Sequence, residues 1–159
     1  MLTLAAFVAL FVLLLTAAVK DIRARRIPNG LVAAVASLWL VWRIALVASA
    51  AMGDADALLV IADSLERAAA ALVIGGGLLG LTLLYERITG RYAFGGGDIK
   101  LVAVVALFLG VMPSLVALTV ACAVSLLYAV LARSTTASNG IPFAPCVACG
   151  LPLAVMLVA

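Results

Sequence analysis

The sequence contains no histidine among its 159 residues, and only 11% of them are charged. Without imidazole there are no histidine metal ligands, no serine–histidine triads and no imidazole proton relays. The small share of charge excludes an ordinary soluble domain, in which about 25% of residues are charged. Any catalysis must therefore use other groups, and most of the surface must face lipid rather than water.

Cysteine is also scarce, with Cys122, Cys146 and Cys149 as its three occurrences. The spacing of Cys146 and Cys149 is that of half a zinc site, yet no second pair completes it. Because both lie in an apolar stretch, we expect them to pack as small apolar side chains. The sequence thus predicts neither a metal site nor an organic cofactor.

Apolar residues make up 68% of the chain and are gathered in long runs. The six runs cover residues 2–19, 31–51, 68–85, 101–112, 115–132 and 141–159. All but the fourth are close to the roughly 20 residues with which a helix crosses a bilayer. We therefore expect an all-α, polytopic membrane protein of about six transmembrane helices, folded as one membrane-embedded domain over residues 1–159. The lipid bilayer is therefore a predicted partner of the protein.

The basic residues are distributed unevenly over the loops of this six-span arrangement. Eight of the ten fall on one side: Lys20, Arg23, Arg25, Arg26, Arg87, Arg91, Lys100 and Arg133. By the positive-inside rule that side is cytoplasmic, so both termini are predicted on the non-cytoplasmic side. The net charge of +3 is then a topology signal and does not indicate a nucleic-acid partner.

Two basic residues remain outside this pattern. Arg67 ends an outer loop, residues 52–67, whose apolar spacing predicts a short interfacial helix. Arg43 lies within the second run, and we expect its side chain to extend to the outer interface.

Two carboxylates stand at the cytoplasmic boundary of the membrane. Asp21 follows the first run, and Asp98 precedes the short fourth run. The 12 residues 101–112 form about 18 Å of helix against about 30 Å of hydrocarbon, so Asp98 is drawn toward the membrane. An ionisable group there is a candidate functional residue. In the alternative interpretation, Asp98 caps its helix and Asp21 balances the neighbouring basic residues.

Two carboxylates that share a site can perform the chemistry of an aspartic protease. One keeps a proton while the other activates water, because both cannot ionise comfortably together. The helix dipole favours the ionised form of Asp98, at a helix start, and the protonated form of Asp21, at a helix end. On this hypothesis Asp98 is the general base.

Three segments resemble motifs of one known family. Residues 21–29, DIRARRIPN, and residues 95–100, GGGDIK, resemble the two aspartate motifs of type IV prepilin leader peptidases, the second being the GxGD motif of these membrane aspartyl proteases. Residues 140–145, GIPFAP, resemble the family's last signature. The resemblance extends over essentially the whole chain, with the motifs in the right order.

This resemblance implies a membrane aspartic endopeptidase that removes the leader of prepilins at the cytoplasmic face of the inner membrane. Asp21 and Asp98 would then be the catalytic residues. Substrate contacts would come from Gly95, Gly96, Gly97, Lys100, Pro142, Phe143 and Pro145. The prolines lack backbone donors and should leave carbonyls unpaired for an extended substrate. We expect the proline segment to lie beside the aspartates.

The subtype is indicated by what precedes Lys20. Only 19 residues do so, which leaves no room for the N-terminal methyltransferase region of larger family members. The short form resembles the peptidases of tight-adherence (Flp-type) pili and also archaeal preflagellin peptidases. Two alternatives stay open: a non-catalytic pilus-assembly factor that binds pilins, and a presenilin-like intramembrane protease, against which the segment 141–145 argues.

Overall fold

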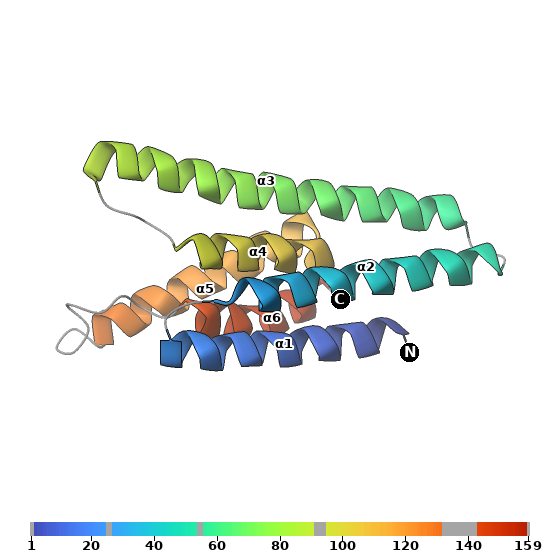
Figure 1. Cartoon of the computed structure of the whole chain (residues 1–159), viewed down its shortest axis with the longest axis horizontal. Helices are drawn as coiled ribbons and strands as arrows, with labels where there is room; N and C mark the ends of the chain where they lie inside the picture. Colours follow the sequence, from blue (N-terminus) through green and yellow to red (C-terminus); the bar gives the residue numbers. More distant parts are fainter. Residues whose placement is uncertain (1, 25–26, 54–55, 91–94, 132–142, 159) are drawn as a thin grey trace.

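The computed structural model describes residues 2–24, 27–53, 56–90, 95–131 and 143–158. In these ranges the chain forms six α-helices and no strand, so the all-helical prediction is confirmed (Figure 1). The helices are α1 (Leu2–Ala24), α2 (Asn29–Ala51), α3 (Ala57–Thr89), α4 (Gly96–Leu109), α5 (Val111–Leu131) and α6 (Ala144–Val158).

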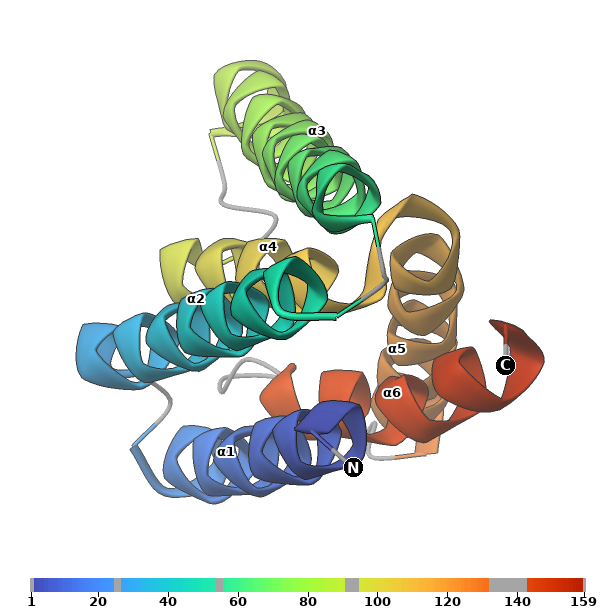
Figure 2. The same cartoon turned by 90° about the vertical axis from the view of Figure 1, so that its right-hand side faces the viewer.

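Successive helices run in alternating directions along one axis, as Figure 1 shows. The last residues of α1, α3 and α5 therefore lie at the same end of the bundle as the first residues of α2, α4 and α6. Seen end on in Figure 2, α1 and α3 lie on opposite sides of the bundle. Asp21 and Asp98 are both carried by helix ends at one end of the molecule.

Four helices are long and apolar enough to cross a bilayer: α1, α2, α3 and, over Val111–Tyr128, α5. The remaining two are shorter, with 14 residues in α4 and 15 in α6. Large apolar side chains such as Leu4, Val41 and Leu72 are exposed on the outer surface, as expected where lipid is the solvent. The fold is that of a multi-pass membrane protein.

The short helix α4 contacts α2, α3, α5 and α6. Seven of its side chains are buried: Ile99, Leu101, Val102, Val105, Ala106, Phe108 and Leu109. It packs closely against α3 at Gly75, where a Cβ atom would lie 2.8 Å from the Cβ of Ala103. Glycine allows this approach because it has no side chain, as is common between membrane helices. The core of the protein is thus built around the helix that carries Asp98.

The prediction of a separate interfacial helix in residues 52–67 is wrong. From Ala57 this segment forms the first turns of α3, which continues as one helix of 33 residues. The prediction for Arg43 is wrong as well, because its side chain is only 6% exposed and pairs with Asp63. Arg43 does not extend to the outer interface because Asp63 of α3 neutralises its charge between the two helices.

Candidate active site

Asp21 lies on the face of α1 that is buried in the bundle. The buried positions Leu10, Leu14, Ala17 and Asp21 follow one another at intervals of three or four residues, which places them on one face of the helix. Asp21 is 6% exposed, whereas the side chain of Ile22 is 59% exposed. The sequence therefore directs this carboxylate inward by the same periodicity that buries the leucines.

The first residue of α6 holds the carboxylate of Asp21. The backbone N–H of Ala144 donates a hydrogen bond to Oδ2 of Asp21 over 3.1 Å. The first N–H groups of a helix have no partner within the helix and lie at the positive end of its dipole, so they favour an anion. The prediction that the proline segment lies beside the aspartates is confirmed for Asp21 at Ala144 and stays a prediction for Asp98, while Pro142 lies outside the described residues.

The expectation of unpaired carbonyls in this segment is wrong at Phe143. Its carbonyl accepts hydrogen bonds from the N–H groups of Cys146 (3.0 Å) and Val147 (3.1 Å), which begin α6. Pro145 stands in the first turn, where its missing N–H costs no helical hydrogen bond. The side chain of Phe143 is 8% exposed and belongs to the core. This residue shapes the start of α6 rather than presenting a free backbone edge.

Asp98 lies in the first turn of α4, ahead of the apolar part of that helix. Gly95 precedes the helix in extended conformation, and a Cβ atom on it would lie 3.1 Å from Oδ2 of Asp98. A Cβ atom on Gly97 would lie 3.2 Å from the Cβ of Ile27, whereas Gly96 is open to its surroundings. Two of the three glycines thus make room, one for the Asp98 carboxylate and one for the segment before α2.

The surroundings of Asp98 disfavour its charged form. Burial, followed by the negative charge of Asp21, raises the pKa of Asp98 to about 6, although a backbone hydrogen bond at Gly95 acts in the other direction. This direction is opposite to the one that the helix dipole predicted. Desolvation and the neighbouring carboxylate outweigh the dipole because Asp98 is half-buried, whereas a terminal dipole is worth only about 1 kcal/mol.

The remaining predicted contact residue, Lys100, is exposed at the same end of the bundle. Its Nζ donates a hydrogen bond to Oδ1 of Asn29 over 3.2 Å, which links α4 to the first residue of α2. The structure therefore gathers Asp21, Asp98, Lys100 and the start of α6 at one end.

The two aspartates are brought to the same end of the bundle although their own helices, α1 and α4, do not pack against each other. The backbones of α1 and α4 are not in contact, but both helices contact α2 and α6. At the shared end of the bundle, the two carboxylates are close enough for the charge of Asp21 to act on Asp98. Such a pair, with one proton between two carboxyl groups, can activate water and polarise a carbonyl.

Sequence reasoning missed one member of this site. The donor at Ala144 is a backbone N–H, so the type of side chain at this position does not indicate it. The signal that could have located it is the neighbouring Pro145, since proline favours the first turn of a helix and the N–H groups there are free to bind an anion.

The fold and the site together define a multi-pass helical membrane protein with two neighbouring carboxylates, one buried and one half-buried, at one end. A family model, the type IV leader peptidase family, matches residues 8–130, a range that contains both Asp21 and Asp98. The chain belongs to the type IV leader peptidase family, and it is therefore a membrane protein of a peptidase family. Comparisons with curated proteins and with solved structures gave no match.

Proposed function

We propose that this protein is an aspartic endopeptidase that removes the leader peptide of Flp-type prepilins at the cytoplasmic face of the inner membrane. Membership of the type IV leader peptidase family supports the reaction and the class of substrate. The observation that carries the mechanism is the pairing of Asp21 with Asp98: one carboxylate is buried and held by a backbone N–H, and the other is desolvated beside it.

In the proposed reaction, Asp98 acts in its protonated form, which its raised pKa favours, and donates a hydrogen bond to the carbonyl oxygen of the scissile peptide. Asp21 accepts a proton from water, and the resulting hydroxide attacks the carbonyl carbon. The tetrahedral intermediate then collapses with cleavage of the C–N bond, and the leaving amine takes the proton that Asp21 accepted from water. The hydrogen bond from Ala144 supports this assignment, because it stabilises negative charge on Asp21.

Around this pair, we assign the glycines and Lys100 to the substrate side of the site. Gly96 leaves space at the start of α4 where an extended peptide can approach the backbone. We also propose Pro142 and Pro145 as substrate contacts; Pro145 lies in the first turn of α6, next to the donor at Ala144. The proposed mechanism uses the carboxyl groups of Asp21 and Asp98 without a metal or an organic cofactor.

The proposal is tested by incubating the purified protein, in lipid, with a candidate Flp-type prepilin and weighing the products by mass spectrometry. Wild type should release the intact leader, and Asp21→Asn and Asp98→Asn should release none. Asp56→Asn is the matched control, because Asp56 is an exposed aspartate before α3, away from the site. A wild-type protein that binds several prepilins without cutting them would instead establish the non-catalytic assembly factor.

A further inference from the structure

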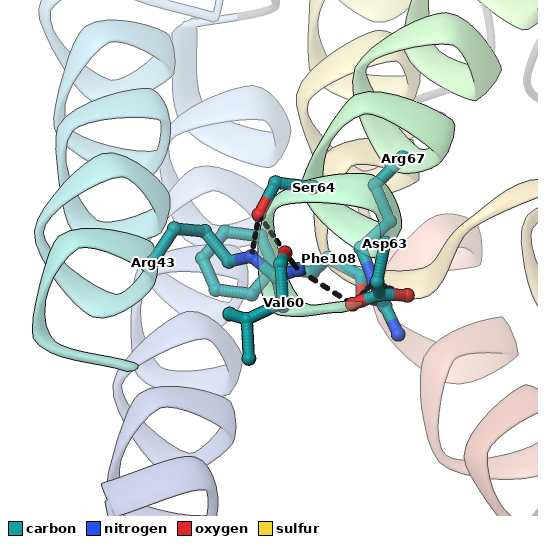
Figure 3. A network of polar contacts seen from close by, with 6 residues as sticks. All are labelled: Arg43, Val60, Asp63, Ser64, Arg67 and Phe108. Atoms are coloured by element: carbon teal, nitrogen blue, oxygen red, sulfur yellow. Dashed lines mark hydrogen bonds and ion pairs between the residues drawn. The ribbon is translucent and has the colours of Figure 1, made fainter. Parts of the chain in front are cut away.

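The other end of α4 is held by a cluster of polar groups from α2 and α3 (Figure 3). We call it the α4 anchor: the side chains of Arg43, Asp63, Ser64 and Arg67 with the backbone carbonyl of Phe108. The Nη1 of Arg67 donates a hydrogen bond to that carbonyl. Its Nε donates to both carboxylate oxygens of Asp63, and each of these two distances is 3.0 Å. The anchor therefore joins the last turn of α4 to α3 through one guanidinium group.

Arg43 completes the anchor from α2. Its Nη2 lies 2.5 Å from Oδ2 of Asp63, and its Nε donates to Oγ of Ser64 over 2.7 Å. Asp63 therefore has two cationic partners, of which Arg43 alone suffices to neutralise it. The second cation, Arg67, is the member that also binds the backbone of α4. A positive charge is favoured there because the last carbonyls of a helix lack partners within the helix.

The side chain of Phe108 is fixed from the opposite direction. It is fully buried, stacks on Trp42 at 5.7 Å between ring centroids and meets the edge of Phe7 at 6.3 Å. Directly after the helix, Gly110 adopts a φ of 79°, a left-handed conformation that favours glycine. The end of α4 is thus clamped by aromatic rings on α1 and α2 and by Arg67 on α3.

The position of this end determines the position of the other end. Asp98 precedes Phe108 by ten residues, 108 minus 98, which is about 15 Å of rigid helix. Because α4 has only 14 residues, a shift or tilt at Phe108 is transmitted to Asp98. Asp21 is held independently by α6, so such a movement changes the placement of the two carboxylates relative to each other.

We propose that Arg67 is a positioning residue for leader cleavage: by binding the carbonyl of Phe108 it sets the axial position of α4 and so places Asp98 opposite Asp21. This inference rests on the proposed function for its catalytic readout. Arg67 itself touches no reacting group. It acts through α4 from the opposite end of the helix, and Asp63 serves to hold its guanidinium in place.

The test compares Arg67→Met, Arg67→Lys and wild type in the leader-cleavage assay, with kcat and KM measured separately. Methionine removes both donors, while Arg43 remains to pair with Asp63. We expect kcat to fall about tenfold to a hundredfold with KM within twofold of wild type, since small misplacements of catalytic groups have costs of this size. Lysine keeps a cationic donor and should recover at least a third of the lost kcat. Glu66→Gln, at the exposed neighbouring position on α3, should behave as wild type.

Three results would overturn the proposal: an unchanged kcat in Arg67→Met, a loss no larger than the loss of folded protein, or no recovery with lysine. A second readout does not depend on activity. The pH at which Asp98 reacts half-maximally with a carbodiimide should differ between Arg67→Met and wild type, because Asp98 has moved relative to Asp21. If wild type cuts no leader, the proposed function fails, and the carbodiimide midpoint of Asp98 then tests the positioning role by itself. A midpoint that differs between Arg67→Met and wild type supports the role of Arg67. An identical midpoint rejects that role.

Discussion

The backbone N–H of Ala144 lies 3.1 Å from Oδ2 of Asp21, although the two residues are 123 positions apart in the sequence. The contact joins the last turn of α1 to the first turn of α6, and it brings a positive helix end to a buried carboxylate. In our account it stabilises the charge that Asp21 carries during catalysis. The segment after residue 142 therefore belongs to the site through its backbone.

Removing this N–H should slow cleavage without removing either aspartate. Ala144→Pro eliminates the donor, and proline is tolerated at the start of a helix. A hydrogen bond to a charged group is worth about 1.5–3 kcal/mol, so we expect kcat/KM to fall roughly tenfold to a hundredfold. Ala144→Gly, which keeps the donor, is the control and should lose much less. Equal losses in both variants would show that the methyl group matters and the N–H does not.

The glycines before Asp98 should differ in their tolerance of a side chain. Gly96→Ala should leave the melting temperature unchanged, because nothing lies within 4 Å of the added Cβ, so any loss of cleavage in this variant reports on the proposed substrate contact. Gly97→Val should lower cleavage at least tenfold, because its Cβ meets Ile27 at 3.2 Å and the branches need further space. Removing the Cβ of residue 27 with Ile27→Gly in the Gly97→Val background should recover activity. The steric explanation is wrong if the double variant is no better than Gly97→Val.

The protonation of Asp98 should depend on Asp21. With a pKa of about 6, Asp98 is protonated below that pH and ionised above it, and the charge of Asp21 is one cause of the raised value. Carbodiimides react with protonated carboxyl groups, so labelling of Asp98, followed by peptide mass spectrometry, should fall through a midpoint near pH 6. In Asp21→Asn the midpoint should move to lower pH, because the neighbouring negative charge is gone. A midpoint that stays in place would contradict the electrostatic pairing of the two residues.

Helix packing gives a prediction for stability. Gly75→Ala places a Cβ 2.8 Å from the Cβ of Ala103, so we expect a loss of about 1–3 kcal/mol and a lower melting temperature in detergent. Gly76→Ala, one position along α3, adds a methyl group to open space and should be neutral or stabilising by up to about 1 kcal/mol. The reverse change Ala103→Gly should restore the stability of Gly75→Ala. If both single variants melt alike, α3 and α4 do not meet at Gly75.

The number of helices and the common end of Asp21 and Asp98 could be predicted from the sequence, because apolar runs and charged boundaries directly reflect the bilayer. The extent of α3 could not be obtained in this way. Asp63 and Arg67 look like loop residues until the partner of Arg43 is known. An arginine inside an apolar run was the available signal, since such a charge needs a partner within the protein.

Long-range backbone contacts are the second feature of the structure that could not be predicted from the sequence. The hydrogen bond at Ala144 and the capping of Phe108 by Arg67 involve main-chain groups, which every residue carries. The protonation of Asp98 depends on burial and on a neighbour 77 positions away, 98 minus 21, so the local helix dipole gave the wrong direction. These features follow from how the helices pack, which residue patterns within one helix do not specify.

The central claim is that Asp21 and Asp98 act as one catalytic unit, and a double-mutant cycle on leader cleavage tests it most directly. We would measure kcat/KM for wild type, Asp21→Asn, Asp98→Asn and the double variant, with the product identified by mass. Residues that act as a unit are strongly non-additive, so each single variant should lose about as much as the double variant. A single variant that keeps substantial activity, or losses that simply multiply in the double variant, would contradict the paired-carboxylate mechanism.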